Sequence, residues 1–253
     1  MADRYFVDSP VHGRLVRLTG QEAQHLARVK RAVPGTQIVL FDGGGAEFPA
    51  RVEKLGRHEV LLSIESRCDV DRELPVELTL AVALPKGDRQ KWLIEKAVEL
   101  GVRRIVPLRT ARSIAQPVEQ ALARLRRTVI EASKQCGRNR LMEITEPVDW
   151  GRFAVSASCA GCRLLAHYDP GGTAAVDLGS LFRSRRMDCS AEVVAAVGPE
   201  GGFAPDEVSQ ALAAAWQPVD LGPRVLRVET AAVLLAAVIS QAFGTKARDL
   251  ALE

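Results

Sequence analysis

Residues 195–208 read AAVGPEGGFAPDEV and place an apolar strand-like run, a glycine-rich turn and a helix-like segment in direct succession. Gly198, Gly201 and Gly202 surround a single carboxylate, Glu200. In an open α/β sheet, ligands bind outside the carboxyl ends of the strands, which is where such a turn lies. Glycines let the backbone approach a ligand closely and adopt positive φ. The stretch therefore predicts an α/β fold with a binding loop after this strand.

The composition of this loop limits the kind of ligand. A P-loop needs a Gly-Lys-Ser/Thr ending and a dinucleotide site needs G-x-G-x-x-G, whereas this loop reads GPEGGF. Acidic residues in the loop and at the helix start disfavour a phosphate, so an uncharged or cationic ligand fits better. Spacing alone also allows a tight strand-to-helix turn that binds nothing.

A second loop, LGPRVLRVETA at residues 221–231, again follows a strand-like run and precedes an apolar helix. It carries a Gly-Pro turn, the cations Arg224 and Arg227, and Glu229 at the start of the helix. Two loops at neighbouring strand ends would form one cleft, which favours a binding site over a purely structural turn.

From about residue 76 onward, strands alternate with amphipathic helices, which predicts a parallel sheet covered on both faces. The expected strands are 77–85, 103–110, 163–169, 192–198 and 218–222, and the expected helices are 88–101, 117–136, 204–216 and 229–243.

The first 70 or so residues show a different pattern of residue types. Short β-branched or alternating runs at 14–19, 36–42, 48–55 and 59–66, with a helix candidate at 20–29, indicate a small β-barrel. The polar stretch CDVDRELPVE at 68–77 is the natural linker. We therefore expect two domains, 1–72 and 73–253.

Positive charge is concentrated in one segment of the chain. Residues 103–140 contain ten Lys or Arg and only two acidic residues, although the net charge of the whole chain is +3. Such a local positive field attracts polyanions and points to nucleic acid. A solvated helix face would explain part of the pattern, but Arg138 and Arg140 continue it past a glycine into a loop.

Other features exclude several classes of protein. The N-terminus resembles no signal peptide and the longest strongly apolar run, Ala231 to Ile239, is too short to span a bilayer, so we expect a cytoplasmic protein without a membrane partner. Cys159 and Cys162 form a C-x-x-C pair, but no second pair supplies a four-ligand zinc site. We expect no metal.

The motif GPEGGF, followed about twenty residues later by LGPRVLRVETA, resembles the ribosomal RNA small-subunit methyltransferase E family of the SPOUT superfamily. The likeness extends over most of the chain, through HLARVKRAVPGTQIVLFDGGG, ALPKGDRQKWLIEKAVELGV, RSIAQ and EASKQCGRNRLMEI. One departure is Val228, where the family more often has threonine in LRTETA.

The resemblance implies a fold and a reaction. The fold is a C-terminal SPOUT-type parallel sheet with a deep trefoil knot, preceded by an N-terminal PUA-like β-barrel. The reaction is S-adenosylmethionine-dependent methylation of ring nitrogen 3 of a uridine in 16S ribosomal RNA, on the small ribosomal subunit, by a homodimer.

The resemblance also implies site residues. Arg227 would stabilise negative charge on the uracil and Glu229 would be the general base or its organiser, although the two could instead be a helix-capping ion pair. Glu200 could line the cofactor pocket or cap a backbone N–H. The expected cofactor-binding residues are Leu165, His167, Gly198, Glu200, Gly201, Gly202, Leu221, Gly222, Leu226 and Thr230. The expected RNA-binding residues are Arg109, Arg112, Lys134, Arg138 and Arg140.

Two alternatives stay open. A methyltransferase of the same fold could modify another RNA position, such as a ribose hydroxyl. A non-catalytic RNA-binding factor in ribosome assembly could have kept the fold.

Overall fold

The structure, a computed structural model, describes residues 3–113, 119–157, 161–167, 176–177 and 192–249. It divides into two compact units. Residues 1–73 and 130–141 form the first unit, and residues 74–129 and 142–253 form the second. The predicted boundary lies close to residue 73, but the segment 130–141, expected in the C-terminal domain, packs with the N-terminal unit.

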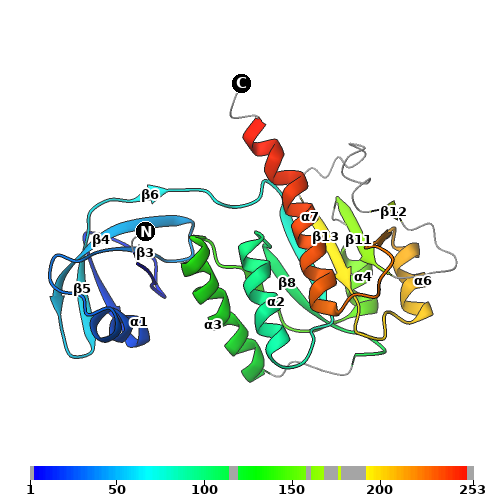
Figure 1. Cartoon of the computed structure of the whole chain (residues 1–253), viewed down its shortest axis with the longest axis horizontal. Coiled ribbons are helices and arrows are strands. Elements are labelled where there is room, and N and C mark those ends of the chain that lie inside the picture. Colours follow the sequence, from blue (N-terminus) through cyan, green and yellow to red (C-terminus); the bar gives the residue numbers. More distant parts are fainter. Residues whose placement is uncertain (1–2, 114–118, 158–160, 168–175, 178–191, 250–253) are drawn as a thin grey trace. The chain divides into compact units, whose positions relative to one another are not determined.

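The first unit contains a mainly antiparallel sheet, the short helical segments α1 and η1, and the C-terminal part of α3 (Glu119–Cys136) (Figure 1). Its strands follow the spatial order β1-β3-β4-β5-β2, with β6 paired to β4 and only β1 and β3 parallel. The elements are β1 (Arg4–Phe6), β2 (Leu15–Thr19), α1 (Gly20–Gln24), the π-helix η1 (His25–Val29), β3 (Gln37–Phe41), β4 (Ala46–Leu55), β5 (Glu59–Ile64) and β6 (Cys68–Asp69).

Alternation along these strands creates the core of the first unit. Phe48, Ala50 and Val52 of β4 are buried at every second position, and Val60 and Leu62 of β5 continue the same face. This period of two is what the sequence predicted for a half-buried sheet. All four strands expected in this region are present, and the helix candidate 20–29 is α1 followed by η1.

The second unit contains a parallel sheet of order β10-β8-β7-β13-β11-β14-β12, with β9 paired to β8. Its strands are β7 (Glu77–Val82), β8 (Arg104–Arg109), β9 (Glu143–Ile144), β10 (Val148–Asp149), β11 (Cys162–Ala166), β12 (Val176–Asp177), β13 (Glu192–Val197) and β14 (Gln217–Asp220). The helices are α2 (Asp88–Glu99), α3 (Glu119–Cys136), α4 (Trp150–Ser156), α6 (Pro205–Ala213) and α7 (Val228–Asp249). The boundary between the two units falls within α3.

Helices cover both faces of this sheet, as the apolar strands require. On one face, α4 and α6 pack on Ala81, Val194 and Ala196 through an aromatic cluster that includes Trp150 and Trp216. On the other face, α7 lies against β7 and β13 and beside α2 (Figure 1). Within the described residues, no helix is both long and apolar enough to span a bilayer.

The path from β14 to α7 brings the two glycine loops together. β14 lies beyond β11 in the sheet, whereas α7 packs on β7 and β13, so the connecting segment 221–227 crosses the carboxyl ends of the intervening strands. Parallel strands place the loop after β13 at the same edge. The trefoil knot implied by the resemblance stays a prediction.

Two local expectations need correction. The helix α4 was not predicted, because WGRFAVS contains a glycine and β-branched or aromatic residues that have low helix propensity. Tertiary packing overrides that propensity, since Trp150 and Ala154 are buried in the aromatic cluster. The strand expected at 163–169 ends at Ala166, and residues 168–169 lie outside the described part of the chain.

Candidate functional site

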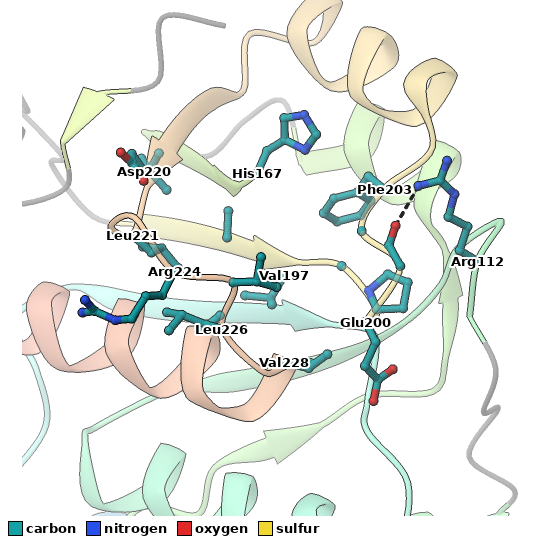
Figure 2. A pocket seen from close by; sticks show the side chains of 18 of the residues that line it. Arg112, His167, Val197, Glu200, Phe203, Asp220, Leu221, Arg224, Leu226 and Val228 are labelled. Atoms are coloured by element: carbon teal, nitrogen blue, oxygen red, sulfur yellow. Dashed lines mark hydrogen bonds between the residues drawn. The ribbon is translucent and has the colours of Figure 1, made fainter. Parts of the chain in front are cut away.

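A cavity of about 340 Å³ lies where the two glycine loops meet at the carboxyl ends of β11, β13 and β14 (Figure 2). Its position agrees with the rule that open parallel sheets bind ligands at this edge. The lining residues are Arg112, Ala166, His167, Val197, Gly198, Pro199, Glu200, Gly201, Gly202, Phe203, Val219, Asp220, Leu221, Gly222, Arg224, Val225, Leu226, Val228 and Ala231.

The first glycine loop needs glycine for two different reasons. A Cβ on Gly198 would lie 3.0 Å from the Phe203 ring and 3.2 Å from the Phe203 backbone nitrogen, so a side chain there would force Phe203 to shift. Gly202 has φ +67°, and its N–H donates a 2.8 Å hydrogen bond to the Pro199 carbonyl, which closes the turn. This left-handed conformation is one that glycine adopts without steric strain.

Two contacts fasten this loop to the turn after β8. The Arg112 Nη1 donates to the Gly201 carbonyl at 2.7 Å (Figure 2). The Glu207 carboxylate accepts hydrogen bonds from the backbone N–H groups of Ala111 and Ala204, both at 2.8 Å. Glu207 therefore caps the start of α6 and joins the two loops, a role that also suits its place at the positive helix end.

The second loop turns at Gly222, which has φ +106°. The Gly222 N–H donates to Asp220 Oδ1 at 2.9 Å, so the end of β14 is held by an Asx-type turn. Leu221 and Leu226 line the cavity, while Val228, where the family more often has threonine, is 3% exposed and also lines it. The second loop therefore supplies a mainly apolar wall.

The cavity gathers most of the residues expected to bind a cofactor. His167, Gly198, Glu200, Gly201, Gly202, Leu221, Gly222 and Leu226 all line it. Leu165 and Thr230 do not. Leu165 is fully buried in the core beneath the cavity, and Thr230 is exposed on the first turn of α7.

Glu200 lines the cavity with its backbone, but its carboxylate points away from the space between His167 and Leu226 (Figure 2). The carboxylate instead pairs with Arg89, at 3.3 Å between Oε1 and Nη1. Arg89 lies in the first turn of α2, more than one hundred residues away in sequence, and sequence reasoning missed it.

The same guanidinium reaches the second motif carboxylate. Arg89 Nη1 lies 3.7 Å from Glu229 Oε2. The Glu229 side chain is only 8% exposed, and its Oε2 is buried without a hydrogen-bond partner. Arg227 is exposed and does not line the cavity. The structure thus places Arg89, rather than Arg227, beside Glu229.

A second cavity of about 190 Å³ adjoins the first and shares Pro199 and Glu200 with it. It lies at the carboxyl end of β7, next to β13 in the sheet. Its other lining residues are Ala83, Leu84, Pro85, Lys86, Arg89 and Ser113.

Two of the predicted RNA-binding residues lie in the second unit. Arg109 binds Asp149 through two hydrogen bonds of 3.1 and 3.2 Å. The Arg109 guanidinium thereby holds the pKa of the Asp149 carboxyl below its usual range. Arg112 is exposed and makes the bond to Gly201 described above.

The other three predicted RNA-binding residues lie in the first unit. Lys134 is 13% exposed and pairs with Glu22 at 2.8 Å, and Arg138 is 3% exposed and pairs with Glu73 through both carboxylate oxygens. In this state neither side chain presents its charge to solvent. Arg140 is exposed, so it is available to a phosphate.

The described residues include His, Cys, Asp and Glu side chains and one of the two C-x-x-C thiols. No group of three or more His, Cys, Asp or Glu side chains there is arranged to hold a metal ion. Cys162 is buried in β11, while Cys159, the other cysteine of the C-x-x-C pair, lies outside the described residues.

Family comparisons agree with this architecture. Residues 72–240 match the family described as "RNA methyltransferase domain", and residues 18–65 match "RNA methyltransferase PUA domain". The predicted fold class, an α/β domain preceded by a PUA domain, is confirmed.

Individual relatives give the same result. The ribosomal RNA small subunit methyltransferase E of Synechocystis sp. is 34% identical over 89% of this chain and 72% of its own length. A Legionella pneumophila protein solved in complex with the bound cofactor SAM has a TM-score of 0.85 at 32% identity, with 96% and 98% of the two chains covered. The ribosomal RNA small subunit methyltransferase E from Neisseria gonorrhoeae bound to S-adenosyl methionine has a TM-score of 0.84 at 30% identity, covering 95% and 98%. The chain therefore belongs to the ribosomal RNA small subunit methyltransferase E family.

Proposed function

We propose that this protein transfers the methyl group of S-adenosylmethionine to ring nitrogen 3 of a uridine in 16S ribosomal RNA of the small subunit. The observation that carries the proposal is the cavity built by two glycine loops that follow β13 and β14, the parallel strands on either side of β11. Membership of the family, and the cofactor in the names of two solved neighbours, support the choice of cofactor.

The cavity fits such a cofactor. Its volume of about 340 Å³ falls in the range of small-molecule sites. Much of its wall is backbone and aliphatic side chain, so backbone atoms of the glycine loops would hold the nucleoside. His167, Gly198, Gly201, Gly202, Leu221, Gly222 and Leu226 are the residues proposed to hold it. When bound, S-adenosylmethionine supplies an electrophilic methyl group on a sulfonium.

The acceptor nitrogen needs help from the protein, because N3 of uracil carries a proton at neutral pH. A base must take that proton, and cations must stabilise the negative charge that spreads onto the flanking carbonyl oxygens. We propose Glu229 as the base, since its buried Oε2 still lacks a hydrogen-bond donor. Arg227, which is exposed and lies in the chain between the cavity residues Leu226 and Val228, is proposed to stabilise one carbonyl oxygen.

RNA binding is proposed to use the exposed cations Arg109, Arg112 and Arg140, because phosphate contacts position an RNA substrate. Lys134 and Arg138 would contribute by stabilising the first unit, through their ion pairs with Glu22 and Glu73.

We also propose that the protein is a homodimer, which light scattering during gel filtration would test. A mass of one chain at working concentration would contradict the dimer.

The experiment that tests the function is methyl transfer from labelled S-adenosylmethionine to small subunits and to naked 16S RNA, both from a strain lacking the activity. Nucleoside mass spectrometry then identifies the product. We expect 3-methyluridine. A 2′-O-methylated nucleoside would support the alternative of another RNA position, and cofactor binding without transfer to either substrate would support the assembly factor.

Kinetic measurements distinguish a catalytic role of Arg227 and Glu229 from a role in shaping the cofactor loop. Arg227→Ala should lower kcat by about 10²-fold or more while leaving the Kd for S-adenosylmethionine close to that of wild type, as for a group acting on transition-state charge. Glu229→Gln should do the same. Parallel losses in kcat and in cofactor affinity would instead indicate that Arg227 and Glu229 shape the loop.

A further inference from the structure

Arg89 stands between the two carboxylates that the glycine loops bring to this edge of the sheet. Its Nη1 lies 3.3 Å from Glu200 and 3.7 Å from Glu229. One guanidinium therefore serves two negative charges that come from different loops. The Arg89 side chain is 39% exposed, so it is open to solvent on one side and to a buried carboxylate on the other.

One carboxylate oxygen of Glu229 is buried without a hydrogen-bond partner. Its side chain is 8% exposed, and its Oε2 has no hydrogen-bond partner, although buried polar atoms in folded proteins are nearly always paired. A carboxylate oxygen can only accept, so what is missing is a donor. The imide N–H of uracil is such a donor, and it is the proton that the proposed reaction removes.

A donor in the second cavity would reach this carboxylate past Arg89, because Glu229 is not among the residues that line the cavity. Its volume of about 190 Å³ is below the range of drug-sized ligands and suits a single pyrimidine ring. Arg89 lines it and touches Glu229, so Arg89 connects the cavity to the buried carboxylate. Pro199 and Glu200 line both cavities, which places an occupant of the second directly against the loop that forms the first.

The charge of the second cavity also suits a ring that becomes an anion. Lys86 and Arg89 line the cavity, and Arg89 pairs with the carboxylates of Glu200 and Glu229. Once Glu229 has taken up the proton, these two cations face the single carboxylate of Glu200, which leaves one positive charge for the ring anion. An electropositive, partly enclosed site stabilises negative charge far better than water does.

We propose that the second cavity receives the acceptor uracil and that Arg89 contacts it, neutralising the charge on one ring carbonyl oxygen. The proposal rests on the function proposed above and names the acceptor site of the same reaction. Arg227 would serve the other carbonyl oxygen, since N3 lies between two of them.

The proton and charge balance explains why one arginine touches both groups. The N3–H bond breaks and the proton passes to the Glu229 carboxylate, leaving the electron pair on N3. The negative charge thus leaves Glu229 and appears on the ring, and Arg89 remains beside it at each stage. The N3 electron pair forms the new bond to the methyl carbon, the carbon–sulfur bond breaks with its pair on sulfur, and Glu229 releases its proton to water.

The test compares wild type, Arg89→Ala and Arg89→Lys on two RNAs, transcribed with UTP or with 5-fluoro-UTP and reconstituted into small subunits. Fluorine at ring position 5 makes the N3 proton more acidic, so less help is needed to form the anion. On uridine RNA we expect Arg89→Ala to lower kcat about 10²-fold, with the Kd for S-adenosylmethionine within about twofold of wild type. On fluorouridine RNA that loss should shrink markedly.

Lys91→Ala is the matched control, because Lys91 is a cation on the same helix that pairs with Glu95 and is 65% exposed. It should behave as wild type on both RNAs. Arg89→Lys keeps a positive charge beside Glu229, so it tests the proposal even if Arg89→Ala unfolds. It should show an intermediate loss of kcat that also shrinks on fluorouridine RNA, at an unchanged Tm.

The experiment distinguishes failure of the role proposed for Arg89 from failure of the proposed function. If wild type makes no 3-methyluridine, the function itself is refuted. If wild type makes it and the Arg89 variants match wild type, or lose the same factor on both RNAs, the acceptor role of Arg89 is refuted while the function stands.

Discussion

Arg112 donates a hydrogen bond to the carbonyl oxygen of Gly201 over 2.7 Å and so ties the turn after β8 to the glycine loop after β13. The sequence marked Arg112 as an RNA contact within a basic segment. In the structure its guanidinium supports the wall of the cofactor cavity, which it also lines. The two roles make different predictions for one substitution.

Replacing Arg112 with alanine should weaken the binding of S-adenosylmethionine. A hydrogen bond from a charged donor contributes about 1.5 kcal/mol at the low end of its range, which corresponds to roughly a tenfold rise in Kd. Calorimetric titration of the variant and of Lys91→Ala measures this. An unchanged cofactor Kd together with weaker RNA binding would assign Arg112 to the RNA alone.

A side chain at Gly198 should destabilise the glycine loop. In Gly198→Ala the new Cβ would lie 3.0 Å from Phe203, whose ring packs 4.6 Å from the ring of Trp150 and cannot move freely. We expect a loss of about 1–3 kcal/mol in the free energy of unfolding from overpacking, and at least a tenfold loss of cofactor affinity.

Gly151 provides the control for that substitution. It lies inside α4, and a Cβ there would meet only the flexible end of Gln210, at 3.1 Å. Gly151→Ala should leave the cofactor Kd unchanged and raise helix stability by up to about 1 kcal/mol. Equal effects of the two substitutions on cofactor affinity would contradict the account of the loop.

Substitutions at Arg138 and Arg140 should have different effects, one on protein stability and the other on RNA binding. Arg138 is 3% exposed and pairs with Glu73, so Arg138→Ala leaves a largely buried carboxylate alone and should lower the free energy of unfolding by about 3–5 kcal/mol. Arg140 is exposed, so Arg140→Ala should keep the Tm but reduce the slope of log K against log salt for RNA binding by about one.

Thermal unfolding and salt titrations of RNA affinity check both variants. A stable Arg138→Ala protein with weaker RNA binding would show that Arg138 contacts RNA. An unaltered salt slope in Arg140→Ala would remove Arg140 from that surface.

Glu47 should make the first unit sensitive to acid. Burial raises the pKa of Glu47, but hydrogen bonds from Arg72 and Arg4 outweigh this, and the pKa lies below its ordinary value. A carboxyl whose pKa is lowered in the folded state stabilises the protein above its ordinary pKa, and this contribution disappears as the pH falls through the folded-state pKa. Glu47→Gln should therefore be less stable than wild type at about pH 7, with a difference that closes toward about pH 3.

Calorimetric unfolding of both proteins across this range measures the difference. Glu59→Gln is the control, because Glu59 pairs with Arg17 only at 4.0 Å with both side chains exposed. A gap between wild type and Glu47→Gln that does not depend on pH would contradict the assignment.

Local pattern was enough to predict much of the fold. The alternation of β4 and the apolar stripe of α2 each reveal the period of their element, and the short continuous apolar run of β13 is typical of a strand buried on both faces. The helix α4 escaped prediction because its stability comes from burial of Trp150 among residues distant in sequence. The glycine loops were found because tight turns leave a local signature in the residue types.

Local sequence patterns could not predict the contacts between residues that are far apart in the sequence. Arg89 looks like any surface cation of an amphipathic helix until folding places it beside Glu200 and Glu229. Similarly, Arg138 looks like part of a basic patch until its pairing with Glu73, 65 positions earlier, is known. Charge counted along a sequence does not reveal which charges are already neutralised by a partner.

The most direct test of the central claim is single-turnover methyl transfer by wild type and Gly198→Ala, with the product identified by nucleoside mass spectrometry of 16S RNA. We predict 3-methyluridine from wild type and a much slower reaction from Gly198→Ala, with Gly151→Ala matching wild type. A methylated ribose, an unmethylated RNA, or an undiminished rate in Gly198→Ala would contradict this prediction.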